Sequence, residues 1–391
     1  MGVILTSLNP NLQTALSINS VIKGLLLAYL IFYGLKSKIS IYFTLTFLCI
    51  LIIPINLINI IGDDYFITNI SILLKIIFNI SVILYFIFNV RSIGDNIYFL
   101  RAYCFITVIP NSLFTLLGFS ELTYSYSDYG LKGIFSSTND AVVSYVLTAF
   151  LIIYNLRQSK YSYYKIDIIF LLLIILQLLI TGTRTSFIFG FIILFFAIFT
   201  SFKKKMTVTN VTITSFLIAI TFFSINTINN QLVDNQYIKG KFLNIFKGDD
   251  TYYISPRARA YDAAIQIFKS RDNLFFGHGY KKFCIKVQSI SGVNSSNLDN
   301  NGKHTEKDTV DILGSFGIFG LLFILSIYFK LASISLKGIN QYMIFIAILC
   351  YSHIAGHILI NPLIYIPIAV FFNTFFILNN CKVKLLKHKI V

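Results

Sequence analysis

The sequence predicts an all-α polytopic membrane protein, a bundle of about eleven transmembrane helices with one large loop outside the membrane. Two features of the composition support this prediction. Of the 391 residues, 56% are hydrophobic and 12% are charged, and the mean hydropathy is +0.75, values outside the range of soluble domains. In addition, apolar runs of about 20 residues recur along the chain, each long enough to cross a hydrocarbon core about 30 Å thick. Because a bilayer offers the backbone no water, bundled helices are the expected solution.

The apolar runs place the expected transmembrane helices in chain order. They lie near residues 16–35, 39–61, 66–90, 98–118, 138–156, 166–181, 185–202, 207–226, 309–329, 340–358 and 361–379. A short or re-entrant element in the first twenty residues would raise the count to twelve. Those first residues have no basic segment ahead of a short apolar stretch, so they do not predict a signal peptide.

The basic residues are distributed unevenly between the two sides of the predicted bundle. The chain carries a formal charge of +16, which in a soluble protein would suggest nucleic acid. Here most lysines and arginines lie in alternate gaps between spans, and these gaps are cytoplasmic by the positive-inside rule. The opposite gaps, near residues 62–64, 121–140 and 182–185, contain just Lys132 and Arg184. We therefore expect a multi-pass protein with a cytoplasmic C-terminal tail and no nucleic-acid partner.

One long polar segment, residues 227–308, separates two groups of predicted spans and falls on the extracytoplasmic side. A segment of this length is too long for a simple connector and is usually functional. The expected regions are therefore transmembrane helices at 1–226, the large loop at 227–308, and transmembrane helices with a basic tail at 309–391. Cys284 is the one cysteine in the loop, so no disulfide framework or cysteine metal site is expected.

The stretch "SPRARAYDAAIQIFKS" predicts a helix inside this loop. Ser255 is a good N-cap and Pro256 suits a first helical turn. Arg257 and Arg259 then fall in the first turn, where guanidinium groups and free backbone N–H groups together favour phosphate oxygens. The alternative is that both arginines are solvated residues of the helix surface.

The stretch "LLITGTRTSFIFGFIILF" places Arg184 in a turn between two spans, at the outer membrane boundary. An arginine at membrane depth is costly and often marks function, although a side chain that snorkels to the head groups is the alternative. Its neighbours Thr181, Thr183 and Ser186 are small polar residues and are expected as its partners.

The stretch "HTEKDTVDILGSFGIFG" joins the large loop to the ninth span. On a helix, His304, Lys307, Asp308 and Asp311 would share one face, and Glu306 would point elsewhere. Asp311 already enters the span, where a carboxylate is costly without a partner or a water-filled cavity. The alternative is a charged helix cap at the membrane interface.

Two further patterns near the C-terminal spans are interpreted as structural. Gly314, Gly317 and Gly320 recur every third residue, which favours close helix packing. His353 and His357 are four residues apart, but no third metal ligand accompanies them, so packing or head-group contact is expected and no metal site.

Four separated stretches resemble the O-antigen polymerase and O-antigen ligase superfamily, integral membrane glycosyltransferases that use undecaprenyl-diphosphate-linked glycans. The stretches are "GIFSSTNDAV" at 133–142, "TGTRTS" at 181–186, "RARAYDAAIQIFKSRDNLFFGHG" at 257–279 and "EKDTVDILGSFGIFG" at 306–320. They occur in the family's order across about half of the chain. The resemblance implies a GT-C-like helical bundle in the bacterial cytoplasmic membrane, with the active site facing the periplasm.

The resemblance also assigns roles. The family has an arginine in the turn that Arg184 occupies and another at the start of the loop helix, followed four residues later by an aromatic. Arg257 and Tyr261 match, and the resemblance implies that these arginines hold the pyrophosphate.

Ligase-type members of the superfamily show a histidine, ten residues and a glycine at the end of the loop. Counting back from Gly317 puts Glu306 in the histidine position, with His304 two residues early. The acidic series Glu306, Asp308 and Asp311 is more similar to polymerase-type members. The resemblance therefore favours a polymerase over a ligase.

A polymerase of this type would join lipid-linked oligosaccharide repeat units. Arginines would stabilise the pyrophosphate leaving group in place of a metal ion, and a general base would accept the proton of the acceptor hydroxyl. The lack of a DxD motif in the loop sequence fits such a metal-independent enzyme without a cofactor. The expected site residues are Glu306, His304 and Asp308 as candidate bases, Arg184, Arg257 and Arg259 for the pyrophosphate, and Tyr261, Asp311 and Asn139 in support.

Three alternatives remain open from the sequence. One is a ligase that transfers finished glycan to lipid A core. Another is a transporter or flippase for lipid-linked sugars, in which charged residues inside many spans would be expected and Lys23 and Lys75 are the main candidates. The third is a scaffold that tolerates loss of Arg184 and Arg257. The expected partners are the lipid-linked donor and acceptor, membrane lipid and, from the resemblance, a separate chain-length regulator.

Overall fold

The computed structural model describes residues 25–30, 32, 66–122, 131–133, 138–158, 164–202, 256–270, 273–292, 305, 307–355, 358–359 and 364–387. In these residues the secondary structure is helical, apart from one pair of very short strands. The chain forms two compact units, each described by itself. The first unit is Met1–Phe99 with Ser255–Val391, and the second is Leu100–Ile254.

Eight expected spans fall on the described residues, and each coincides with a helix. They are α4 (Phe66–Asn89), α5 (Ile93–Leu116), α6 (Thr138–Gln158), α7 (Tyr164–Ile180), α8 (Arg184–Phe202), α13 (Asp308–Ser335), α14 (Ile339–Ala355) and α15 (Tyr365–Lys387). Among the described residues, three stretches are long and apolar enough by themselves to cross a membrane: Ile72–Asn89, Ile93–Leu116 and Asp308–Ser335. The prediction of a multi-pass helical membrane protein is confirmed.

The described residues include little or nothing of three other expected spans. Those near 39–61 and 207–226 lie outside the described residues, and the span near 16–35 is described at residues 25–30 and 32, which are helical.

Buried amides join the spanning helices of the first unit. α4 packs along α15. The Asn79 amide donates to the Tyr328 hydroxyl at 2.9 Å, which links α4 to α13. Asn96 donates to Thr374 at 3.2 Å and accepts from Asn373 at 2.9 Å, which links the start of α5 to α15. These amides act as interhelical hydrogen-bonding groups, as expected for polar residues inside a membrane bundle.

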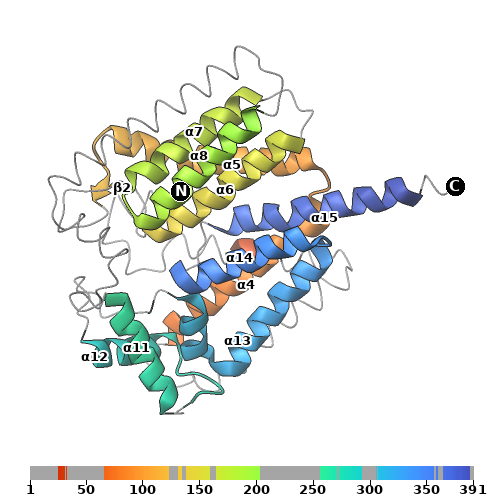
Figure 1. Cartoon of the computed structure of the whole chain (residues 1–391). Coiled ribbons are helices and arrows are strands. Elements are labelled where there is room, and N and C mark those ends of the chain that lie inside the picture. Colours follow the sequence, from red (N-terminus) through yellow and green to blue (C-terminus); the bar gives the residue numbers. More distant parts are fainter. Residues whose placement is uncertain are drawn as a thin grey trace. The chain divides into compact units, whose positions relative to one another are not determined.

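Two helices of the large loop lie side by side in the first unit (Figure 1). α11 (Pro256–Lys269) is the predicted loop helix and begins at Pro256, as expected. α12 (Tyr280–Ser291) was not predicted. Its buried side chains Phe283 and Cys284 lie four and three residues before the buried Val287, which is a helical spacing. The three lysines of α12 obscured this pattern in the sequence.

α13 is broken at Gly317, whose φ of 70° and ψ of −174° are not helical. We call residues 273–279, which lie between α11 and α12, the clamp loop. The clamp loop supplies partners for the backbone groups that the break frees. The hydrogen bonds run from His278 N to Gly314 O (2.9 Å), Gly279 N to Ser315 O (3.0 Å), Ile318 N to Leu274 O (3.0 Å) and Phe319 N to Phe275 O (3.3 Å). The clamp loop therefore pairs four of the backbone groups beside the break.

The three glycines of α13 have different surroundings. A Cβ at Gly314 would collide with the Phe283 ring, so this glycine allows α12 to pack closely, as predicted. A Cβ at Gly317 would collide with the Phe275 carbonyl. Its φ of 70° together with a ψ of −174° also falls in a region that is essentially restricted to glycine. A Cβ at Gly320 would meet the Phe316 side chain of the same helix. The prediction of close interhelical packing thus holds for Gly314, whereas Gly317 makes the break.

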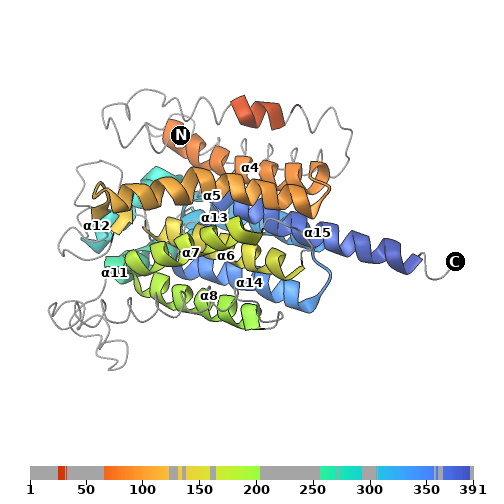
Figure 2. The same ribbon diagram turned by 90° about the horizontal axis from the view of Figure 1, so that it is seen from above.

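The second unit contains most of α5, the helices α6 to α8 and a small strand pair. α6, α7 and α8 pack against one another (Figure 2). Arg101 makes a two-pronged ion pair with Asp167, with both N···O distances 2.7 Å, and this pair ties α5 to the first turn of α7. The strands β1 (Glu121–Leu122) and β2 (Leu131–Gly133) pair antiparallel, in a gap where the sequence predicted no strand.

We predict that Gly317→Ala lowers the free energy of unfolding by at least about 2 kcal/mol, because a side chain in this strained backbone region costs about 1–3 kcal/mol and the collision with the clamp loop adds to it. Thermal unfolding of the detergent-solubilised protein measures the loss. Gly292→Ala is the control without a collision: its φ of 62° and ψ of 13° are left-handed helical, and nothing lies within 4 Å of the added Cβ, so a loss of about 1 kcal/mol is expected. Equal losses of stability in the two variants would contradict close packing of the clamp loop against Gly317.

Candidate functional site

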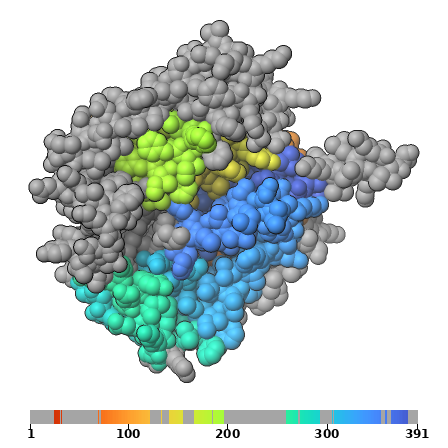
Figure 3. Space-filling view, viewed as in Figure 1, coloured from red at the N-terminus to blue at the C-terminus, as the bar shows by residue number. Residues whose placement is uncertain are grey.

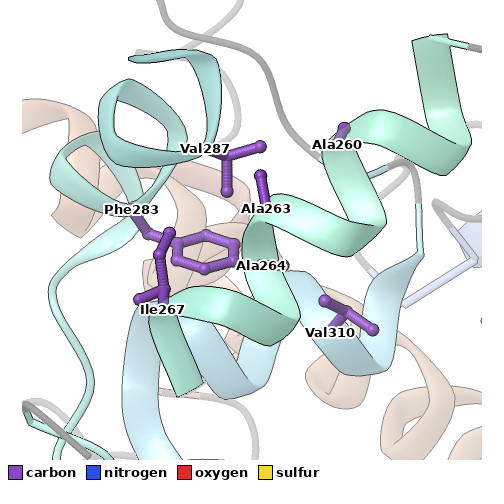
Figure 4. Packing of buried hydrophobic residues seen from close by; sticks show 7 residues of the cluster. All are labelled: Ala260, Ala263, Ala264, Ile267, Phe283, Val287 and Val310. Carbon is purple, nitrogen blue, oxygen red and sulfur yellow. The ribbon is translucent and has the colours of Figure 1, made fainter. Parts of the chain in front are cut away.

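The loop helices share one apolar core with the start of α13 (Figure 4). α11 contributes small side chains, so the neighbouring helices approach it closely. The Phe283 ring of α12 stacks on Phe268 of α11 with ring centroids 5.9 Å apart. The buried members of the core are Ala260, Ala263, Ala264, Ile267, Phe283, Val287 and Val310. As a result, the surfaces of α11 and α13 lie next to each other on the face of the molecule that Figure 3 shows.

A cation–π contact joins the residue before α13 to α11. The Lys307 ammonium lies 3.6 Å from the centroid of the Tyr261 ring, well within the range of a favourable contact. Lys307 has extended backbone angles (φ −129°, ψ 108°) and is the N-cap of α13. The prediction that Lys307 shares a helix face with Asp308 and Asp311 is therefore wrong, because the helix begins one residue later.

Asp311 fixes the chain just ahead of α13. Its Oδ1 accepts hydrogen bonds from the backbone N–H of Thr305 at 2.9 Å and from the Thr305 hydroxyl at 2.8 Å. Both residues are buried. Thr305 and Lys307 flank Glu306 in the sequence, so Asp311 holds one sequence neighbour of that residue.

Asp308 ties α13 to α14 and to the segment after it. Its Oδ2 accepts from the Ser352 hydroxyl at 2.6 Å and from the backbone N–H of Leu359 at 2.9 Å. Asp308 has no exposed surface. These bonds explain how a carboxylate is tolerated at the start of a membrane span.

The remaining candidates at this end of α13 are only partly described. Glu306 and His304 lie outside the described residues. The Thr309 hydroxyl contacts Nδ1 of His353, so His353 packs on the start of α13, while His357 also lies outside the described residues.

The first turn of α11 carries both arginines expected for the pyrophosphate. Arg257 and Arg259 lie at the second and fourth positions of the helix. Arg259 is exposed, and the Arg257 side chain lies outside the described residues. The anion-binding arrangement predicted from the sequence is therefore compatible with the backbone of α11.

The turn around Arg184 belongs to the second unit. Arg184 is the first residue of α8, and its side chain is not among the described ones. Thr183 and Ser186 cap this helix reciprocally: each side-chain oxygen accepts from the other's backbone N–H at 3.1 Å. The Thr181 hydroxyl donates to the Gln177 carbonyl at 2.6 Å. The sequence predicts that Thr181, Thr183 and Ser186 contact Arg184. In the structure their side chains hydrogen-bond to the backbone of this turn and of the helix before it. Asn139 is the second residue of α6, and its side chain is likewise not described.

Sequence reasoning missed a basic group on α12. Lys286 Nζ lies 3.4 Å from Nδ1 of the buried His278, and the Lys281 backbone N–H donates to Asn69 of α4 at 3.0 Å. The stretch "GHGYKKFCIK" was the available signal. Cys284 is buried, and this burial, with the Asp311 carboxylate nearby, raises the pKa of its thiol above the ordinary value, which favours a packing role.

We predict that Asp308→Ala lowers the free energy of unfolding by about 3 kcal/mol, because the Ser352 hydroxyl and the Leu359 N–H lose their acceptor in a buried place. Thermal unfolding measures this loss. Asp308→Asn keeps an acceptor oxygen and should recover most of the stability. If Asp308→Ala retained native stability but lost activity, the structural role of Asp308 would be refuted and a role as the base supported.

Residues 169–325 match the family model described as O-antigen ligase. No curated protein matches the chain, and no solved structure does. The matched residues run from α7 through α8, α11 and α12 into α13 and include Arg184, Arg257 and Asp308. The match confirms the resemblance to the O-antigen polymerase and ligase superfamily. It supports a glycosyltransferase of this general type that acts on lipid-linked oligosaccharides in the membrane.

Proposed function

Because residues 169–325 match the O-antigen ligase family, we propose that this chain polymerises undecaprenyl-diphosphate-linked oligosaccharide repeat units. One observation carries the proposal most directly. The two loop motifs, 257–279 and 306–320, pack together through a shared core and the Lys307–Tyr261 contact. The helix that bears Arg257 and the segment next to Glu306 therefore belong to one assembly.

The proposed reaction needs three parts. The acceptor hydroxyl attacks the anomeric carbon of the growing glycan, and the bond from that carbon to the pyrophosphate oxygen breaks. Arg184, Arg257 and Arg259 stabilise the negative charge of the departing lipid pyrophosphate by charge-assisted hydrogen bonds. A general base takes the proton of the hydroxyl. No metal ion is required in this scheme.

Glu306 is the first candidate for the base, with His304 second. Asp308 and Asp311 are buried and accept hydrogen bonds that hold the start of α13, so their carboxylates are used in the fold. Glu306 also stands where ligase-type members carry a histidine, which supports a polymerase. The proposed site faces the periplasm at the bacterial cytoplasmic membrane, with a chain-length regulator as a further partner.

The second candidate function is a ligase that transfers glycan to lipid A core, favoured by the description of the matching family. The two functions differ in the acceptor. Purified protein would be incubated with a defined undecaprenyl-diphosphate repeat unit and excess chelator, and the products separated by size. A ladder of lengthening glycans is expected. A single transfer that requires lipid A core would instead establish a ligase, and lack of product with either acceptor would favour transport or a missing partner protein.

We predict that Arg184→Ala, Arg257→Ala and Glu306→Ala each abolish the glycan ladder while the protein still folds and inserts. Lysine in place of either arginine should also impair polymerisation, because an ammonium cannot replace the two-pronged guanidinium contact. Lys269→Ala is the matched control, since it removes one positive charge from the exposed far end of α11. Normal chain lengths from any of the three alanine variants would remove that residue from the mechanism.

We predict that Tyr261→Leu lowers the polymerisation rate about fivefold, because loss of the cation–π contact, worth about 1 kcal/mol, loosens the segment ahead of α13. Tyr261→Phe keeps the ring and should have nearly the normal rate. Initial rates at saturating lipid-linked substrate give the comparison. Equal rates for the leucine and phenylalanine variants would exclude a positioning role for the ring.

A further inference from the structure

The clamp loop exposes two large aromatic side chains. Phe275 is 58% exposed and Phe276 is 48% exposed. Both rings contact Phe319 of α13, with centroid distances of 5.8 and 5.6 Å. Phe319 is itself 52% exposed, and Leu322, three residues further along α13, is 59% exposed. These four residues form a continuous apolar surface, which we call the clamp patch.

The clamp patch is held firmly against α13. Four backbone hydrogen bonds join the clamp loop to both sides of the break. Gly277 has a φ of 80°, and a Cβ there would collide with the backbone of Ser315. The backbones of the two segments are thus in direct contact. Phe275 and Phe276 cannot move away from Phe319 unless this contact opens.

The position of Phe319 along α13 indicates what covers the patch. After the break, Ile318–Ser335 is about 27 Å long at 1.5 Å per residue, close to the hydrocarbon thickness of about 30 Å. This part of α13 can therefore cross the core almost by itself, with Phe319 and Leu322 at one edge. Exposed apolar side chains of a spanning helix face lipid, and the rings of the clamp loop continue the same surface.

We propose that the clamp loop inserts into the membrane edge and that the clamp patch binds the acyl chains of bilayer lipids. Residues 273–276 then form a membrane-embedded element outside the spanning helices. The broken helix donates to the Leu274 and Phe275 carbonyls, and the Gly277 N–H donates to the Asn273 carbonyl. These bonds lower the cost of placing this backbone at the membrane edge. Since α11 precedes the clamp loop and α12 follows it, this contact anchors both helices at the membrane surface. The inference does not depend on the reaction that the protein catalyses.

Tryptophan fluorescence tests this proposal directly, because the natural chain contains no Trp. Phe275→Trp and Phe276→Trp each introduce one fluorophore into the full-length protein. The variants are reconstituted into vesicles of phosphatidylcholine brominated on its acyl chains near the head-group end, which quenches only fluorophores close to that depth of the membrane. Both should lose most of their fluorescence relative to vesicles of unbrominated lipid, as Phe319→Trp should. Asp262→Trp, at an exposed charged position of α11, is the control and should keep its fluorescence.

Quenching of both clamp-loop variants no greater than that of Asp262→Trp would overturn the proposal. Quenching that disappears as the protein-to-lipid ratio rises would also overturn it, because a second copy of the chain would then cover the patch. Two independent positions keep the test valid if one substitution prevents folding. Native elution on size exclusion identifies which variants are folded.

Discussion

A polar backbone cannot remain unpaired at the edge of a membrane, and the first unit is organised around this constraint. Gly317 interrupts α13 and frees carbonyl and N–H groups that a continuous helix would have paired. The clamp loop supplies those partners from a segment about 40 residues earlier in the chain. Because the clamp loop directly connects α11 with α12, the same hydrogen bonds determine where both loop helices lie against α13.

The charged residues at the start of α13 have two different roles. Asp308 and Asp311 are buried, and their hydrogen bonds to Ser352, Leu359 and Thr305 offset the cost of removing carboxylates from water. Lys307 instead lies over the Tyr261 ring, on the side of α11. The charged segment before and at the start of α13 thus contains two acids that stabilise the fold, Asp308 and Asp311, beside Glu306, which is a candidate catalytic base. This division supports Glu306 as the base in the proposed mechanism.

Much of the fold could be predicted, because its signals are local. The long apolar runs predicted the spans at α4, α6 and α8 to within a few residues, and Ser255 with Pro256 predicted the start of α11. α12 was missed because its lysines interrupt the apolar pattern. The shared helix face that included Lys307 was wrong, since no sequence pattern showed that the helix begins at Asp308.

The sequence by itself determined the membrane class, the positions of most spans, and the residue types that suit a pyrophosphate and a base. These features follow from hydropathy, helix-end preferences and side-chain chemistry, which act over short stretches. Only the tertiary structure decided that Asp308 is a buried acceptor, that Tyr261 meets Lys307, and that Gly317 breaks α13 against the clamp loop. Each of these depends on contacts between residues about 40 positions or more apart in the chain, and local physics does not encode such contacts.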